Sequence, residues 1–587
     1  MLPLRALLPR TSLKKTPLLW LRYSDRNQNV KTTIRSCSCS TRPLSHAETA
    51  GFSTQSSSNN QRAQLNPTTS DPPTPQTDHR TLAQTHNLFI TSPYSPGSPL
   101  LLPNGTHIFQ KLQAFLRAQY PQFGFREVVT PTIYKKSLWE ASGHWDNYAD
   151  DMFSVQGRGA TGETEGKEKG EDEEFGLKPM NCPGHCLLFR EGEGGLRSWR
   201  DLPVRYADFS ALHRNEISGT LTGLTRVRRF HQDDAHIFCR PDQILSEIER
   251  TLEFVSMVYE TFNLGPYKLL LSTRPDDHFI GTIEEWTRAE SQLTTALNNS
   301  GREWSINAGD GAFYGPKIDI ILKDNQGKEH QTATIQLDFQ LPQRFDLQYQ
   351  ASPAELAETN ASSSSSSSSP PVTDNDNNSN NPTATRRPVI IHRAIYGSLE
   401  RFMALLIEHY SGTYPFWLSP RPATILSVNT DPATIAHVET LQSVLSGLLN
   451  DPPGSSNSPN DDNLTRPSKP TPLPLSKPLI PITTDVSARP LGKKIAEAKA
   501  KKYNHIVVVG PSEVASGRLN IELANQPHAD RAVEVLKDIL GPEAGVESAG
   551  AGKGNGKGNG RRNGNVKVGM EGVQARRYFE RLMDLYL

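Results

Sequence analysis

The sequence predicts an α+β domain followed by a smaller α/β domain. Between about residues 88 and 418, several stretches alternate apolar and polar residues with the period of a half-buried strand. Several of these stretches follow one another without a helical pattern between them, which favours an antiparallel sheet over a doubly wound parallel one. From about residue 420 onwards, strand-like and helical patterns alternate, as in a separate α/β unit.

The expected elements follow from these periodicities. In the first block we expect strands at 204–209, 317–322 and 334–339, and helices at 244–262 and 397–410. In the second block we expect a strand at 423–428, helices near 434–448 and 487–502, and a buried strand at 505–510.

Segments of biased composition flank and interrupt the two blocks. Residues 1–47 hold nine basic residues and one acidic residue, which is typical of an organelle transit peptide, although a merely basic tail would look the same. Residues 48–85 are rich in Ser, Gln, Asn and Pro, which predicts a disordered linker. We therefore expect one domain at 86–419 with low-complexity insertions at 156–174 and 351–388, and another at 420–587 with disordered insertions at 451–478 and 543–564.

Composition argues against several classes of protein. No run of 18 apolar residues occurs, so no membrane-spanning segment is expected. Five cysteines in 587 residues exclude a scaffold built on disulfides. Basic and acidic residues number 63 each, and outside residues 1–47 they number 54 and 62, a net charge of −8. This charge argues against a general polycation that holds nucleic acid by counterion release alone, so any contact with RNA must be local.

Two neighbouring segments carry polar residues at strand spacing. Arg214 and Glu216 stand two apart, so a strand would place both on one face, where the guanidinium could grip a phosphate. A solvated cross-strand ion pair is the alternative. Further on, the strand period places Gln232, Asp234 and His236 on one face together with Phe238. Such groups are costly to bury without partners, which indicates a polar site for a small zwitterion unless the face is exposed.

Two other segments offer candidate ligands. Cys182, His185 and Cys186 follow a turn fixed by proline, but no second Cys/His pair at short spacing completes a zinc finger. Any zinc ion must draw ligands from distant parts of the chain, and by spacing alone Cys182 is either such a ligand or an ordinary buried thiol. Ser398 and Arg401 share a face near the start of a helix, where backbone donors and the helix dipole favour anions. They indicate phosphate binding, unless Arg401 is a routine surface arginine.

Several short motifs occur in a fixed order. Three of them are Gly-Phe-Arg-Glu-Val-Val-Thr-Pro from Gly124, His-Arg-Asn-Glu from His213 with Arg-Val-Arg-Arg-Phe and Gln-Asp-Asp-Ala-His after it, and Gly-Ser-Leu-Glu-Arg from Gly397. In this order they resemble the signature motifs of class II aminoacyl-tRNA synthetases. Within that class, Lys-Pro-Met-Asn-Cys-Pro-Gly-His from Lys178, Gly-His-Trp-Asp-Asn-Tyr from Gly143, Phe-Tyr-Gly-Pro-Lys from Phe313 and Ile-His-Arg-Ala from Ile391 are similar to threonyl-tRNA synthetases. The resemblance covers roughly 85–418 and, more loosely, 420–587, where an anticodon-binding domain is implied.

The resemblance implies an activity and a set of site residues. The enzyme would activate threonine with ATP and Mg²⁺ to threonyl-adenylate and transfer it to the 3′ end of threonine tRNA. A zinc ion that selects threonine would be held by Cys182, His236 and His392, leaving a coordination position open. The implied ATP-binding residues are Arg214, Glu216, Arg226, Gln331, Ser398 and Arg401, and the implied catalytic residues are Arg214, Arg401 and Lys317. The implied threonine-binding residues are Met180, Gln232, Asp234, Tyr314, Thr334 and Gln336.

Further expectations concern assembly, location and fidelity. The segment ending at Pro131 resembles the class II dimer interface, so a homodimer is expected. Only about 85 low-complexity residues precede the catalytic block, whereas full-length members of the family carry an N-terminal editing domain. This shorter form fits an enzyme of the mitochondrial matrix, and it predicts appreciable activation of serine.

Two alternatives are weighed against this interpretation. Prolyl- and seryl-tRNA synthetases share the fold, but the set of Cys182, His236 and His392 argues against both. A synthetase-like RNA-binding protein without activity should have lost ATP contacts, and here Arg214 and Arg401 are both present.

Overall fold

The computed structural model describes residues 78–156, 174–192, 195–277, 279–323, 327–356, 385–449, 479–541 and 566–587. The predicted transit peptide at 1–47 and the predicted insertions at 451–478 and 543–564 lie outside these residues. Within the described ranges, no helix is both long enough and apolar enough to cross a membrane.

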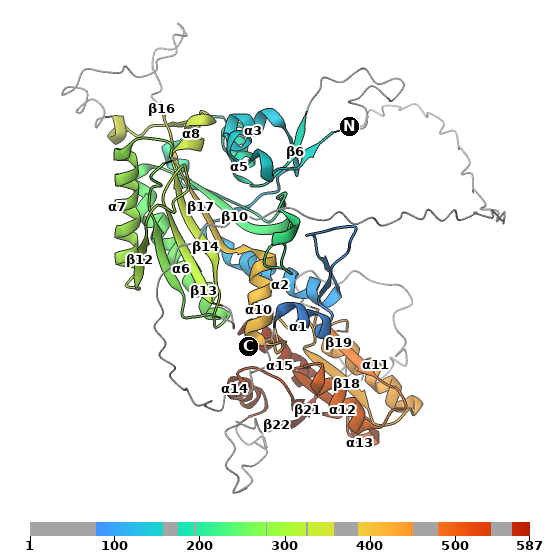
Figure 1. Ribbon diagram of the computed structural model, residues 1–587. Helices are drawn as coiled ribbons and strands as arrows, with labels where there is room; N and C mark the ends of the chain where they lie inside the picture. Colours follow the sequence, from blue (N-terminus) through green and yellow to red (C-terminus); the bar gives the residue numbers. More distant parts are fainter. Residues whose placement is uncertain are drawn as a thin grey trace, which may run out of the picture. The chain divides into compact units, whose positions relative to one another are not determined.

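A large, mainly antiparallel sheet forms the centre of the first domain (Figure 1). Its strands lie in the order β12 (Trp304–Asn307), β11 (Lys268–Ser272), β13 (Lys317–Lys323), β14 (Glu329–Asp338), β17 (Val389–Ser398), β10 (Arg229–Cys239), β8 (Val204–Asp208) and β3 (Arg126–Glu127), with β9 (Ala211–His213) paired to β10. The pairs β11–β12 and β3–β8 are parallel, and the other neighbours are antiparallel. The predicted α+β domain around an antiparallel sheet is confirmed.

Four long helices pack against this sheet and supply much of the core: α2 (Pro103–Phe123), α6 (Ile244–Thr261), α7 (Ile283–Asn299) and α10 (Leu399–Tyr410). In α6, the buried residues Ile244, Ile248 and Val255 recur on one helical face, as the sequence pattern predicts. Helices α6 and α7 lie side by side in Figure 1. The helix predicted to start at Gly397 starts at Leu399, because Gly397, with φ of 69°, still belongs to β17.

Shorter elements surround the large sheet. Three small sheets pair β1 (Phe89–Ile90) with β2 (Leu100–Leu101), β6 (Phe175–Leu177) with β4 (Ile133–Lys135) and β5 (Ser154–Val155), and β15 (Tyr349–Gln350) with β7 (Arg197–Ser198) and β16 (Thr385–Arg386). The short helices are α1 (His79–His86), α3 (Lys136–Ser142), α4 (His144–Tyr148), α5 (Cys182–Glu191) and α8 (Gln340–Arg344).

One predicted boundary is wrong. The disordered linker was expected to run to residue 85, yet His79–His86 form helix α1. The helix is stable here because Asp78 caps its first turn and because His79, Ala83 and His86 are buried. The low-complexity insertion predicted at 351–388 carries contacts at both edges, where β16 pairs with β15 and Glu355 accepts from the backbone N–H of Ser352 at 2.7 Å.

The second domain is a five-stranded sheet with helices, as predicted. Its strands lie in the order β19 (Ile482–Asp485), β18 (Ala423–Ser427), β20 (His505–Val509), β21 (Arg518–Leu523) and β22 (Val566–Glu571). The first three are parallel and the last two join antiparallel. The helices are α11 (Pro432–Ser446), α12 (Leu491–Ala500), α13 (Pro511–Ser516), α14 (Ala529–Leu540) and α15 (Gly572–Asp584).

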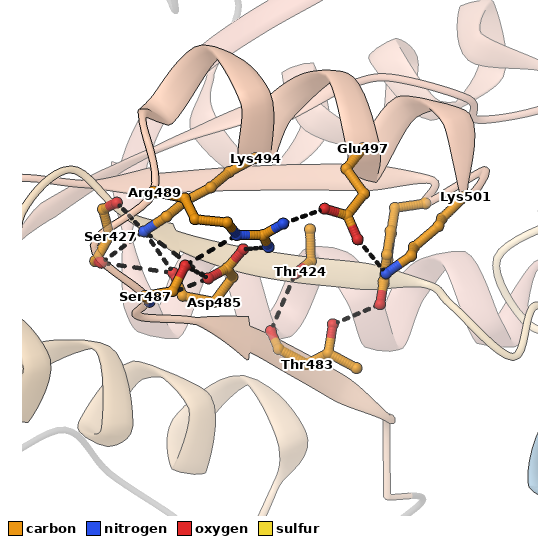
Figure 2. A network of polar contacts seen from close by, with 10 residues as sticks. Thr424, Ser427, Thr483, Asp485, Ser487, Arg489, Lys494, Glu497 and Lys501 are labelled. Atoms are coloured by element: carbon orange, nitrogen blue, oxygen red, sulfur yellow. Dashed lines mark hydrogen bonds and ion pairs between the residues drawn. The ribbon is translucent and has the colours of Figure 1, made fainter.

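A network of polar contacts joins α12 to the ends of β18 and β19 (Figure 2). The ammonium group of Lys494, which is 1% exposed, donates to the carbonyl oxygens of Ser427 at 2.9 Å and Asp485 at 3.1 Å. Arg489 donates to the carboxylates of Asp485 and Glu497, each at 2.6 Å. Lys494 is therefore a structural lysine whose charge is satisfied inside the domain, and it is not offered to an RNA.

A buried ion pair fixes the register of two central strands. Asp233 and Arg393 are each 0% exposed, and the carboxylate accepts from the guanidinium Nη1 at 3.0 Å. The same carboxylate accepts from the backbone N–H groups of Ile395 at 2.7 Å and Tyr396 at 2.9 Å. These bonds lie where the register between β10 and β17 shifts. Asp233 thus satisfies two backbone donors at a break in the ladder.

Replacement of Asp233 by alanine is expected to destabilise the first domain by roughly 3 kcal/mol or more, because the buried guanidinium of Arg393 loses its counter-charge and two buried N–H groups lose their acceptor. The midpoint of urea unfolding, followed by tryptophan fluorescence, measures the change. Asp242→Ala is the matched control, since the side chain of Asp242 is 65% exposed in its ion pair with Arg240. It should cost less than about 1 kcal/mol. Equal midpoints for the two variants would contradict a structural role for Asp233.

Candidate active site and metal centre

Three potential metal ligands from distant parts of the chain meet in the first domain. His236 of β10 lies directly opposite His392 of β17 in the antiparallel register, and their ring centroids are 4.5 Å apart. Cys182 begins α5, and all three residues are buried. One ligand atom from each of Cys182, His236 and His392 lies within 4.8 Å of the others. The structure therefore brings together the three residues that the sequence analysis names as a metal-ligand set.

Each imidazole of this set has a second partner that fixes its orientation. The Nδ1 atom of His236 lies 2.7 Å from Nδ1 of His185, which leaves Nε2 for the ligand set. The Nε2 atom of His392 lies 2.9 Å from the carboxylate of Asp338, which leaves Nδ1. Such outer partners are usual for metal-binding histidines, because they fix the tautomer and the ring orientation.

The donor set fits a zinc ion. One sulfur and two imidazole nitrogens are preferred zinc ligands, and three protein ligands characterise sites that keep a position for substrate. Burial raises the pKa of the Cys182 thiol well above its usual range, and burial lowers the pKa of His236. Without a cation, the thiol and this imidazole are therefore neutral, and a bound divalent ion would favour the thiolate.

A pocket lined by arginine lies beside the ligand set and shares β10 and β17 with it. All six residues predicted to bind ATP line this pocket: Arg214, Glu216, Arg226, Gln331, Ser398 and Arg401. Ser398 caps α10, since its hydroxyl accepts from the backbone N–H of Arg401 at 3.3 Å. The start of a helix and several guanidinium groups thus face one cavity, an arrangement that favours a polyanion.

The arginines of the pocket are held in place by backbone carbonyls and a carboxylate. Arg401 donates from Nε to the carbonyl of Thr225 and from Nη1 to the carbonyl of Gln331, both at 3.2 Å. Arg226 pairs with Glu216 at 2.7 Å. Burial lowers the pKa of Arg401, and the nearby charges of Arg214 and Arg226 lower it further. Phosphate groups would relieve this repulsion.

Two details of the predicted ATP-binding and catalytic residues differ in the structure. The strand expected to carry Arg214 and Glu216 ends at His213, because the chain turns away to donate from the N–H of Asn215 to the carbonyl of Asp151 at 2.7 Å. Both side chains still reach the pocket. Lys317 is not among the lining residues. It pairs with Asp319 at 2.9 Å and Asp310 at 3.2 Å.

The residues predicted to bind threonine divide between the ligand set and the arginine-lined pocket. Tyr314 has its ring centroid 5.7 Å from that of His392, and its hydroxyl donates to Gln336 at 3.0 Å. Gln336 lies opposite His392 in the register of β14 and β17. Asp234 is buried two residues before His236. Gln232 and Thr334 instead line the pocket, and the register shift after Gln232 breaks the strict alternation expected along β10.

Met180, the remaining residue predicted to bind threonine, lies beside a histidine that was not predicted as a site residue. Met180 contacts His144, whose Nε2 lies 3.2 Å from the Met180 sulfur and 3.8 Å from the Cys182 sulfur. Burial lowers the pKa of His144 to about 4. Phe238, by contrast, is buried against Phe189 in an apolar cluster and belongs to the core. The only sequence signal for His144 was the motif that contains it.

Comparisons with known families and relatives agree with this geometry. Residues 164–361 match the family of the tRNA synthetase class II core domain (G, H, P, S and T), and residues 475–533 match the anticodon binding domain. The probable mitochondrial threonine–tRNA ligase of Schizosaccharomyces pombe is 45% identical over 448 residues, which cover 76% of this chain and 84% of the relative. The mitochondrial threonine–tRNA ligase of Saccharomyces cerevisiae is 44% identical over 458 residues, covering 76% and 87%.

A solved structure is similar as well. The RNA-binding domain of threonyl-tRNA synthetase from Cryptosporidium parvum superposes with a TM-score of 0.61 at 40% identity, covering 76% of this chain and 93% of that one. High identity over most of the mitochondrial relatives, together with both matched domains, identifies the family. The chain belongs to the threonyl-tRNA synthetases, the threonine–tRNA ligases, and is of the mitochondrial type with a class II core and an anticodon-binding domain.

Proposed function

We propose that this threonine–tRNA ligase acts in the mitochondrial matrix, works as a homodimer, and selects threonine with a zinc ion held by Cys182, His236 and His392. The observation that carries the proposal is the approach of the three ligand atoms to within 4.8 Å, beside a pocket lined by arginine on the same two strands. Because the amino-acid site and the nucleotide site share β10 and β17, they can hold the carboxylate of threonine close to the α-phosphate of ATP.

In the first step, the arginines would bind and orient ATP. Arg214 would hold the α-phosphate, Arg226 and Arg401 would hold the outer phosphates, and Glu216 would face the adenine. The threonine carboxylate attacks the α-phosphorus, the bond to the β-phosphate oxygen breaks, and pyrophosphate leaves with Mg²⁺. Positive charge that is already in place stabilises the transition state, so no covalent protein nucleophile is needed.

In the second step, the 3′-terminal hydroxyl of threonine tRNA attacks the carbonyl of the adenylate, and AMP leaves. Asp234, Tyr314 and Gln336 would orient threonine, with Gln232 and Thr334 on the side of the nucleotide. The zinc ion, when bound, would supply an electrophilic position for the amino and hydroxyl groups of threonine, which valine cannot match. Lys317, held by Asp319, would lie at the edge of the substrate site.

Location and assembly rest on independent features. The basic composition of residues 1–47 and the similarity to mitochondrial threonine–tRNA ligases of two yeasts support the mitochondrial matrix. Val129 is 85% exposed and Ile133 is 46% exposed in the segment after β3, which supports burial of this segment by a second copy. Purified protein should carry about one zinc per chain and should charge mitochondrial threonine tRNA. A chain that contains no zinc but charges threonine at full rate would overturn the zinc proposal.

Serine should be activated with an efficiency only about 10- to 200-fold below that of threonine, because the two substrates share the hydroxyl group and differ by one methyl group. Exchange of pyrophosphate into ATP, measured with each amino acid, gives the ratio. Valine is the matched control, and it should give no exchange above background. A serine-to-threonine ratio far below one in a thousand would mean that the pocket reads the methyl group by another means.

A further inference from the structure

The loop that carries Glu216 and Arg226 is held at its tip by a helix outside the pocket. This loop, residues 214–228, joins β9 to β10. The backbone N–H of Leu224 donates to Nε2 of His79 at 3.2 Å, and His79 begins helix α1. The next residue, Thr225, offers its carbonyl to Arg401 of α10 at 3.2 Å.

The hydrogen bonds of His79 fix its tautomer. Because Nε2 accepts from a backbone N–H, the ring proton of the neutral imidazole must sit on Nδ1. That nitrogen lies 2.9 Å from the carboxylate of Glu408, which also accepts from the backbone N–H of His79 at 3.1 Å. The imidazole therefore forms a hydrogen-bonded bridge between the carboxylate of Glu408 on α10 and the backbone N–H of Leu224 in the loop. We call this bridge the relay.

Helix α10 thus holds two adjoining residues of the loop. Arg401 and Glu408 stand seven residues apart, which is close to two helical turns, so both lie on one side of α10. Arg401 holds the carbonyl of Thr225 directly, and Glu408 holds the N–H of Leu224 through His79. Arg226, which lines the pocket, follows immediately.

The relay is dry. His79 is 4% exposed, Glu408 is 6% exposed and Leu224 is 0% exposed, so water cannot readily replace a lost partner. The backbone also approaches the ring closely at Gly223, where φ is 48° and a Cβ atom would lie 2.2 Å from Nε2 of His79. Glycine is therefore required at this position for the contact to form.

A metal ion is a poorer explanation of the same cluster. Ligand atoms of Asp78, His79 and Glu408 lie within 4.8 Å of one another. An ion on Nδ1 of His79 would place the ring proton on Nε2, where it would face the N–H of Leu224. The hydrogen-bond pattern fits a protonated Nδ1 and a carboxylate acceptor instead.

We propose that His79 is a positioning residue for ATP: with Glu408, it holds the loop that places Glu216 and Arg226 in the nucleotide pocket. The inference rests on the proposed role of these two residues in ATP binding. Helix α1 therefore contributes to the nucleotide site although none of its residues lines the pocket.

Kinetics of pyrophosphate exchange in the full chain test this proposal. His79→Ala should raise KM for ATP about tenfold, because the buried N–H of Leu224 loses its acceptor and the carboxylate of Glu408 loses the imidazole donor. KM for threonine should change less than about twofold. His79→Gln should recover most of the loss, since one amide offers an acceptor and a donor. Equal losses in the two variants, or an equal rise in KM for threonine, would overturn the proposal.

His86→Ala is the matched control. His86 is 4% exposed at the other end of the same helix, where it contacts Arg421 at 3.2 Å rather than the loop. This variant should leave KM for ATP within about twofold of the wild type. A rise equal to that of His79→Ala would mean that loosening of α1, and not the relay, causes the effect.

Hydrogen exchange of backbone amides, measured without ATP, tests the relay independently of the proposed roles of Glu216 and Arg226 in ATP binding. In His79→Ala, the amide of Leu224 should exchange at least about tenfold faster than in the wild type and in His86→Ala. Unchanged exchange would overturn the relay. Failure of the proposed function gives another result, namely that Arg226→Ala leaves KM for ATP unchanged while the amide of Leu224 still responds to His79→Ala.

Discussion

Replacement of Cys182 by alanine is expected to abolish threonine activation, with a fall of about three orders of magnitude or more in exchange efficiency. The variant removes the only sulfur of the proposed ligand set, and two imidazoles alone bind zinc weakly. The nucleotide pocket does not include Cys182, so the affinity for ATP should stay within about twofold of the wild type. Zinc content, threonine-dependent exchange and ATP binding by calorimetry measure the three quantities.

The matched control for this variant lies four residues further along the same helix. Cys186 is also a buried thiol of α5, at 0% exposure, but it is not in the ligand set. Cys186→Ala should keep about one zinc per chain and most of the activity, and it should cost only about 1 kcal/mol of stability through lost packing. Full threonine activation in Cys182→Ala would contradict the zinc account. A loss of activity in Cys186→Ala as large as that expected for Cys182→Ala would contradict it too.

Replacement of Arg214 by alanine is expected to lower the efficiency of adenylate formation by about 100- to 1000-fold, because it removes a charged donor from the transition state. The guanidinium of Arg214 stacks over Phe230 at 5.1 Å and lines the nucleotide pocket. Arg214→Lys should recover only part of the activity, since an ammonium group cannot grip a phosphate with two parallel hydrogen bonds. Exchange kinetics with saturating threonine measure the loss.

An arginine at the start of the strand that follows the loop of Arg214 provides the comparison. Arg229 is an exposed residue at the start of β10, with Nη2 3.3 Å from His231, and it is not among the pocket residues. Arg229→Ala should change the efficiency less than about twofold. Zinc content should be normal in all three variants. If Arg214→Ala matched Arg229→Ala, the assignment of the α-phosphate to Arg214 would be wrong.

Much of the fold could be predicted from periodicity, because buried residues recur every second position in a strand and every three to four positions in a helix. The alternation at 204–209 and 317–322 and the helical spacing at 244–262 correspond to β8, β13 and α6. Helix α1 was missed because a short, polar helix carries little periodic signal. It is stabilised by burial of His79 and His86 against residues far along the chain.

The site was predictable only where short motifs carried it. Cys182, His236 and His392 could be named from the resemblance, but their approach depends on the register of β10 against β17, which no local pattern reveals. The partners of these residues, such as His185, were missed for the same reason. Outer contacts are set by tertiary packing, and a lone histidine in a sequence gives no sign of its neighbour.

Zinc K-edge X-ray absorption of the purified enzyme, with and without threonine, tests the central claim most directly. The ligand set predicts one sulfur at about 2.3 Å and two imidazole nitrogens at about 2.0–2.1 Å. Threonine should add nitrogen or oxygen ligands to this shell, and valine should leave the spectrum unchanged. A shell with several sulfurs, or a spectrum that does not respond to threonine, would contradict direct recognition of threonine by the metal.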